Sequence, residues 1–197
     1  MRRIMLVVFT TALTLLAMGG VALAATIHCP NDPSEGSPST GLYCYGTSLA
    51  DAMYGSDLSD TMYGKGAKDA MHGYGGGDEL RGDKGSDRIY GDAGADFALW
   101  GGAFDTNSLN PYTDASDDYV HGGSGDDHIK GGFAQGGVDR LYGEGGNDTI
   151  EASQRNESFS PVTKEVIDCG PGAGDEVVYD KGLDVVTNCE IQHGLSF

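Results

Sequence analysis

Basic side chains are scarce in this sequence. Its 197 residues include 12 Lys and Arg against 30 Asp and Glu, which gives a formal net charge of -18 at pH 7. Such an acidic chain should be repelled by nucleic acids and by anionic lipid surfaces, so we expect no nucleic-acid partner. Two interpretations remain open: the acids bind cations, or the charge serves only solubility.

The sequence also lacks the residue patterns of common catalytic sites. Its five histidines are His28, His72, His121, His128 and His193, and none lies in a His-Glu-x-x-His zinc motif. No Gly-x-Ser-x-Gly stands between an expected strand and helix, and the four cysteines lack the close spacing of zinc ligands. We therefore expect that the protein is not an enzyme, and a hydrolase is only the third hypothesis, after two kinds of binding protein.

No long amphipathic helix pattern follows the N-terminal region, and that region has the pattern of a secretory signal. Arg2 and Arg3 precede a mostly apolar stretch, and Ala22-Leu23-Ala24 fits the small-x-small rule before a cleavage site. The pattern predicts a signal peptide over residues 1–24, a secreted mature chain and no stable membrane insertion after cleavage. A membrane anchor is the alternative, but the apolar run is short for the ~20 residues that a span needs.

Glycine, in contrast, is abundant, at 33 of 197 residues. From Gly46 onward the glycines recur every nine residues rather than every three, which excludes collagen. Six consecutive blocks begin with Gly and carry Asp at the sixth place and, at the eighth, an apolar residue: GTSLADAMY, GSDLSDTMY, GKGAKDAMH, GYGGGDELR, GDKGSDRIY and GDAGADFAL. Gly permits the positive φ of tight turns, Asp supplies a hard oxygen ligand, and the last three residues alternate as a strand does. Each block therefore predicts a turn followed by a short strand.

The nine-residue pattern is interrupted near residues 100–117 and then resumes. Later blocks include SDDYVH, GGSGDDHIK, GEGGNDTIE, GPGAGDEVV and YDKGLDVVT, with a looser stretch over 152–165. We expect an N-terminal cap over 25–45, a repeat region over 46–151, and a looser segment with a C-terminal cap over 152–197. The candidate metal ligands are the sixth-place aspartates of the repeat region: Asp51, Asp60, Asp69, Asp78, Asp87, Asp96, Asp118, Asp127, Asp139 and Asp148.

The blocks resemble the Gly-Gly-x-Gly-x-Asp-x-apolar-x repeat of the RTX, or haemolysin-type, calcium-binding proteins. GGSGDDHIK and GEGGNDTIE are near-perfect copies of that repeat. The resemblance implies an all-β fold, a right-handed parallel β-roll (a β-solenoid), with several calcium ions held between successive turns by Asp carboxylates and glycine carbonyls. It also implies that turns two blocks apart stack, so that Asp69 pairs with Asp87, Asp78 with Asp96, and Asp87 with Asp105 further along.

Apolar burial alone cannot fold such a repeat. Each block offers one inward apolar side chain while nine residues must be ordered, and stacked carboxylates repel each other. A divalent ion between the carboxylates reverses that repulsion, which predicts that calcium binding is coupled to folding. Leu49 and Leu58 replace the fourth-place Gly of the first two blocks, so their sites should be weak. The alternative is an acidic solenoid whose turns are capped by Asp without metal.

Four cysteines in a secreted chain predict two disulfides, with three pairings open. About six coils spaced ~4.8 Å apart place the ends of the roll ~25–30 Å from each other, whereas disulfide-bonded Cα atoms lie within ~7 Å. This distance favours Cys29–Cys44 and Cys169–Cys189, each closing one end of the roll.

The ninth place of several blocks points outward and carries aromatic rings: Tyr54, Tyr63, His72, Tyr90, His121 and Tyr142. The simpler interpretation is a solvated ladder of side chains. The alternative is an adhesin, or a surface- or carbohydrate-binding module, that uses this outward face or the 100–117 insertion and has an unknown extracellular ligand.

Overall fold

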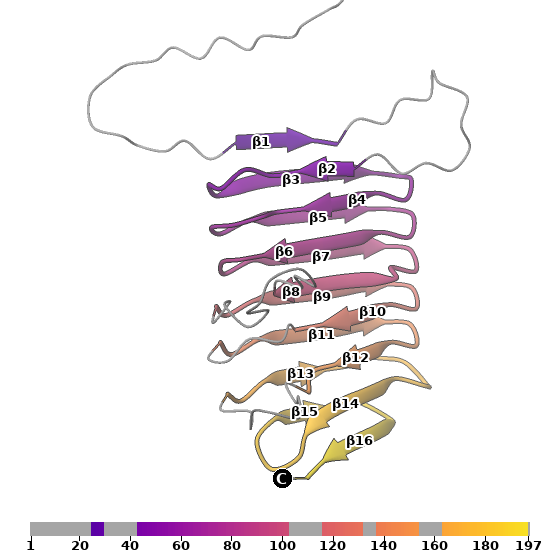
Figure 1. Cartoon of the computed structure of the whole chain (residues 1–197). Coiled ribbons are helices and arrows are strands. Elements are labelled where there is room, and N and C mark those ends of the chain that lie inside the picture. Colours follow the sequence, from indigo (N-terminus) through magenta and orange to yellow (C-terminus); the bar gives the residue numbers. More distant parts are fainter. Residues whose placement is uncertain (1–24, 30–42, 103–115, 132–136, 154–162, 197) are drawn as a thin grey trace, which may run out of the picture.

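The computed structural model describes residues 25–29, 43–102, 116–131, 137–153 and 163–196. These residues form two parallel sheets of eight strands each, and the chain alternates between the sheets as it winds along the roll (Figure 1). The predicted all-β parallel roll is therefore confirmed. The expected signal peptide and most of the 100–117 insertion lie outside the described residues. Within the described ranges no helix is long and apolar enough to cross a membrane.

The odd-numbered strands form one sheet, here called the odd sheet, in sequence order. Its strands are β1 (Ala25–His28), β3 (Asp51–Ser56), β5 (Ala70–Tyr74), β7 (Arg88–Ala93), β9 (Tyr119–Ser124), β11 (Arg140–Gly145), β13 (Val166–Asp168) and β15 (Val185–Thr187). The even sheet contains β2 (Tyr43–Tyr45), β4 (Thr61–Tyr63), β6 (Glu79–Asp83), β8 (Ala98–Gly102), β10 (His128–Lys130), β12 (Thr149–Glu151), β14 (Glu176–Asp180) and β16 (Ile191–Leu195). The sheets thus extend beyond residues 46–151 at both ends.

The core is a double column of apolar side chains between the sheets. Equivalent residues stack in register, as Met53 does with Met71 and Met71 with Ile89. The fully buried members are Met53, Met62, Met71, Leu80, Ile89, Leu99, Val120, Ile129, Leu141, Ile150, Ile167 and Val177. Each strand from β3 to β14 contributes one of them, because alternate residues of a strand face opposite sides of its sheet.

The sixth block departs from the nine-residue pattern by one residue. Its expected inward residue was Ala98, but the register pairs Leu80 with Leu99 and places Ala98 one step earlier. Phe97 is the extra residue and is 57% exposed. The shift buries a leucine in place of an alanine, which stabilises the core because more apolar surface leaves water.

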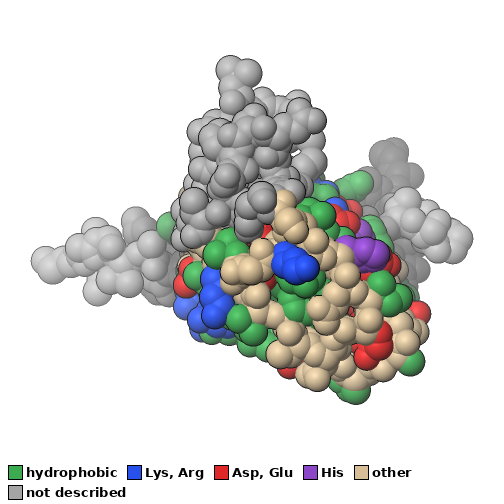
Figure 2. All heavy atoms as spheres, turned by 90° about the horizontal axis from the view of Figure 1, so that it is seen from below, with side chains coloured by type: hydrophobic (Ala, Val, Ile, Leu, Met, Phe, Trp, Pro, Cys, Tyr) green, Lys and Arg blue, Asp and Glu red, His purple; other side chains and the backbone are tan. Residues whose placement is uncertain are grey.

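Both predicted disulfides are present. Cys29 and Cys44 join the first two strands of the roll with a Cα–Cα distance of 5.5 Å, and Cys169 and Cys189 join the last coils at 5.1 Å. Figure 2 views the roll from its C-terminal end, where charged and hydrophobic side chains are mixed. Charges beside open strand edges oppose edge-to-edge pairing between molecules.

Candidate metal centre

The acids that begin or precede strands β3 to β16 lie in two columns, one along each edge of the roll, and all of them except the last members, Asp184 and Glu190, are buried. One column leads into the odd strands and contains Asp51, Asp69, Asp87, Asp118, Asp139, Glu165 and Asp184; the other leads into the even strands and contains Asp60, Asp78, Asp96, Asp127, Asp148, Asp175 and Glu190. All ten predicted aspartates are members, and none is more than 3% exposed. Their role as metal ligands stays a prediction.

Hydrogen bonds connect each acid to the next acid of its column. The backbone N–H of Asp69 donates to Oδ1 of Asp87 at 2.8 Å, and that of Asp78 donates to Oδ1 of Asp96 at 2.8 Å. The expected pairing of Asp87 with Asp105 is wrong, because Asp87 donates to Oδ1 of Asp118 at 2.8 Å. The next acid of the column is therefore 31 residues away along the chain rather than 18.

The second carboxylate oxygen of many column acids is left without a hydrogen bond. Among the described residues, the buried Oδ2 atoms of Asp69, Asp78, Asp96, Asp127, Asp148 and Asp175 have no partner. A buried anionic oxygen without a partner is costly, so such a column calls for a cation. The first-place glycines leave the space: a Cβ on Gly64 would collide with Oδ2 of Asp69 and lie 2.7 Å from the carbonyl oxygen of Gly82.

The first two acids of the columns are satisfied differently. Oδ2 of Asp51 accepts from the backbone N–H and the hydroxyl of Thr47 at 2.6 and 3.0 Å. Oδ2 of Asp60 accepts from the N–H and hydroxyl of Ser56 at 2.7 and 2.8 Å. The hydroxyl at the second place of each block therefore gives Oδ2 the partner that a bound cation would give it in the other blocks. This is a further reason to expect weak calcium sites in the first two blocks.

The donor set fits a hard cation that tolerates mixed oxygen ligands. In the described part of the chain no three His, Cys, Asp or Glu side chains converge on one point. An ion between the turns would therefore need backbone carbonyl oxygens, such as that of Gly82, in addition to carboxylates. Ca²⁺ accepts six to eight such ligands with flexible geometry, whereas structural Zn²⁺ prefers thiolate and imidazole.

Burial makes several of the column carboxylates weaker acids than usual. It raises the pKa of Asp69, Asp78 and Asp127 to about 7 and that of Asp148 to about 6, and the carboxylates of neighbouring turns add to the effect. The backbone N–H that each acid accepts acts in the opposite direction. The columns therefore favour either protons or a bound cation over bare charges.

We expect low pH to replace calcium in part, because protons can neutralise the buried carboxylates as calcium does. A carboxyl whose pKa is raised in the folded state stabilises the fold fully below its unfolded pKa of about 4, and that contribution is lost as the pH rises through about 7. In calcium-free buffer, lowering the pH from 8 to 5.5 should therefore increase the β-structure seen by far-UV circular dichroism. In saturating calcium the signal at pH 8 should already be complete. An equal or larger calcium-free signal at pH 8 than at pH 5.5 would contradict the prediction.

Glu165 and Glu190 occupy column positions that the Gly–Asp repeat pattern does not predict. Glu165 is 1% exposed, accepts the N–H of Asp139, and has its pKa raised to about 8 by burial and by the nearby Asp139 carboxylate. Glu190 accepts the N–H of Asp175 at 3.2 Å. The acid-x-apolar spacing of Glu165-Val-Ile167 could have revealed the first, because Ile167 is the core residue of β13.

A comparison with known protein families matches the RTX calcium-binding nonapeptide repeat (4 copies) over residues 45–78, 72–105 and 112–150. These ranges span half of the chain and include all ten predicted aspartates. No curated protein and no solved structure matches the chain.

Proposed function

The chain belongs to the RTX calcium-binding nonapeptide repeat family, and from that premise we propose that it is an extracellular protein whose folding is coupled to calcium binding. The observation that carries the proposal is the row of buried Oδ2 atoms without partners at Asp69, Asp78, Asp96, Asp127 and Asp148. Folding the calcium-free chain at neutral pH requires these oxygens to be buried as bare charges or to take up protons.

The residues that would hold calcium are the column acids and the carbonyl oxygens beside them. When bound, calcium supplies positive charge between successive carboxylates. The chain itself supplies the rigid spacing, because each acid is fixed by the N–H of the acid before it, as Asp96 is by Asp78. Binding to the folded state alone adds its free energy to folding. The role we propose is structural and not catalytic, because the acids are buried rather than presented to a substrate.

Two features support an extracellular location. The two disulfides, Cys29–Cys44 and Cys169–Cys189, belong to an oxidising compartment. The sequence before Ala25 has the pattern of a cleaved signal peptide. A protein that folds on calcium would stay unfolded where free calcium is scarce and fold where it is plentiful.

Calcium should change the chain from largely unstructured to β-rich. We expect far-UV circular dichroism at pH 8 to show little β-structure in chelator and a full β signal in millimolar calcium, with calorimetric titration giving several ions per chain. Magnesium at the same concentration should not restore the fold, because it requires rigid octahedral geometry and loses its water reluctantly. Equal β-content in chelator and in calcium would refute coupled folding, and equal recovery in magnesium would refute the ligand set.

A further inference from the structure

The outer face of the odd sheet carries a continuous ladder of rings along its middle. The ladder contains His28, Tyr54, His72, Tyr90, His121 and Tyr142, and successive ring centroids lie 4.5–5.9 Å apart with nearly parallel planes. Because the rings cover each other's faces, mainly ring edges point away from the sheet. Sugars usually bind by stacking on open ring faces, so the ladder interior is poorly suited to carbohydrate.

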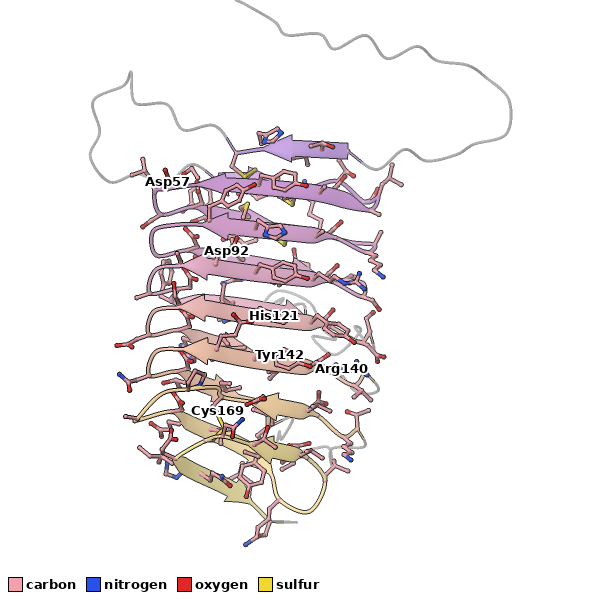
Figure 3. The ribbon with its side chains drawn as sticks, turned by 180° about the vertical axis from the view of Figure 1, so that it is seen from behind. Asp57, Asp92, His121, Arg140, Tyr142 and Cys169 are labelled. Atoms are coloured by element: carbon pink, nitrogen blue, oxygen red, sulfur yellow. A yellow bond between two sulfur atoms is a disulfide. The ribbon has the colours of Figure 1, made fainter. Side chains whose placement is uncertain are left out.

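Two different rows of residues flank the ladder on the three central strands β7, β9 and β11. On one side Tyr119 lies between two guanidinium groups, with Arg88 5.7 Å and Arg140 4.9 Å from its ring centroid. Neither arginine forms an ion pair with a carboxylate of the described residues. We call these three residues the Arg–Tyr–Arg knob. Figure 3 shows Arg140 beside the ladder on this side.

The other flank of the same three strands carries the opposite features. Here Asp92, Gly123 and Glu144 occupy equivalent positions in successive coils. Gly123 has no side chain, and a hollow of about 250 Å³ lies over it, with Asp92 and Glu144 on either side. Asp92 lies on the far side of the ladder from Arg140 (Figure 3). We call this arrangement the acidic hollow.

The two acids of the hollow have a positive φ, and each carboxylate is fixed by a contact with a ladder imidazole. Asp92 and Glu144 have φ values of 72° and 70°, in a region that side chains other than glycine rarely adopt. Each accepts from an imidazole of the ladder: Oδ2 of Asp92 lies 3.1 Å from Nδ1 of His72, and Oε1 of Glu144 lies 2.8 Å from Nδ1 of His121. The same positive φ recurs at Lys65, Tyr74 and Asp83, so it belongs to the turn of the repeat; what is particular to Asp92 and Glu144 is the imidazole that fixes each carboxylate.

We propose that this face binds the same face of a second copy of the chain, through a two-fold axis parallel to the roll. Such an axis places equal coils opposite each other and exchanges the two flanks. Arg88 then faces the second copy's Asp92, Arg140 faces its Glu144, and Tyr119 enters its hollow over Gly123. Both halves of the contact are present on one chain, as an isologous interface requires.

The two flanks of the neighbouring strand β5 are also complementary under this two-fold axis. Its two flanking residues are Ala70 and Tyr74, so the two-fold axis places a small side chain opposite a large one. Tyr74 is 47% exposed in the single chain, although it is a large ring. In the dimer the ring edges of the two ladders meet at the centre. One symmetry operation thus matches charge on β7, β9 and β11 and side-chain size on β5.

Paired charge reversals test the dimer directly. We expect the calcium-loaded chain to sediment as a dimer over a concentration series in analytical ultracentrifugation. Arg140→Glu alone places Glu opposite Glu144 of the second copy, and Glu144→Arg alone places Arg opposite Arg140. Either variant should weaken the dimer at least ~100-fold, because symmetry applies each repulsion twice. Lys181→Glu is the control for Arg140→Glu. It also replaces a positive charge by a negative one, but at an exposed turn near the C-terminal end, and should leave the dimer intact.

Mixing the two single variants should restore a dimer, now containing one copy of each. In that pair the new Glu faces the new Arg, and Glu144 faces Arg140. Circular dichroism in calcium checks that each variant is folded, and recovery on mixing cannot come from two misfolded chains. A monomeric wild-type chain would overturn the proposal. So would a dimer that resists both reversals, or folded variants that fail to recover together, since either result would place self-association elsewhere or make another ligand the partner of this face.

Discussion

Asp69→Ala should raise the calcium concentration needed for half-maximal folding at least ~10-fold, a change equivalent to about 1.4 kcal/mol for each calcium ion bound on folding. Asp69 sits between Asp51 and Asp87 in its column, and its Oδ2 is buried without a partner. Removing it takes a carboxylate from the turns on both sides, and in a roll each coil depends on its neighbours. A calcium titration followed by circular dichroism measures the shift.

Asp51→Ala is the matched control in the same column. The Asp51 carboxylate is already satisfied by Thr47, so we expect a shift of no more than ~2-fold from the loss of a weak or empty site. The prediction fails if Asp51→Ala shifts the midpoint as far as Asp69→Ala. That result would mean that the N-terminal blocks bind calcium as well as the central ones.

Gly94→Ala should prevent folding even in millimolar calcium. Gly94 has a φ of 140°, and a Cβ there would collide with the carbonyl oxygen of Gly76 in the turn two blocks earlier. The substitution combines a backbone conformation that alanine avoids with a clash against main chain, which cannot move without opening the stack. We expect the loss of most of the β signal, or a melting temperature in calcium that is lower by well over ~10 °C.

Gly66→Ala tests whether glycine as such is required in these turns. The nearest atom to a Cβ on Gly66 is the carbonyl oxygen of Lys84 at 3.6 Å, an ordinary contact. The calcium-loaded melting temperature should therefore change by only a few degrees, about the effect of ~0.5 kcal/mol. Similar losses for both substitutions would show that general turn flexibility, and not the close approach at Gly94, is what matters.

Regular spacing made most of the fold predictable from the sequence. With Gly and Asp recurring at fixed places, the turn, the short strand and the inward residue of each block follow from local geometry. Cys29–Cys44 and Cys169–Cys189 followed because a rod keeps its ends apart. The prediction was wrong where spacing changed: Leu99 replaced Ala98 in the core, and Asp118 replaced Asp105 in the column.

The amino-acid sequence alone determined the repeat, the alternation of turn and strand, and the aspartates that line the turns, because each depends on contacts within nine residues. The tertiary structure decided which acids follow each insertion, and it showed that Glu165 joins the column and that Thr47 and Ser56 satisfy their aspartates. It alone revealed the Arg–Tyr–Arg knob and the acidic hollow on one face. Stacking brings together residues that are 18 to 31 positions apart, and no pattern within one block predicts which of them will be in contact.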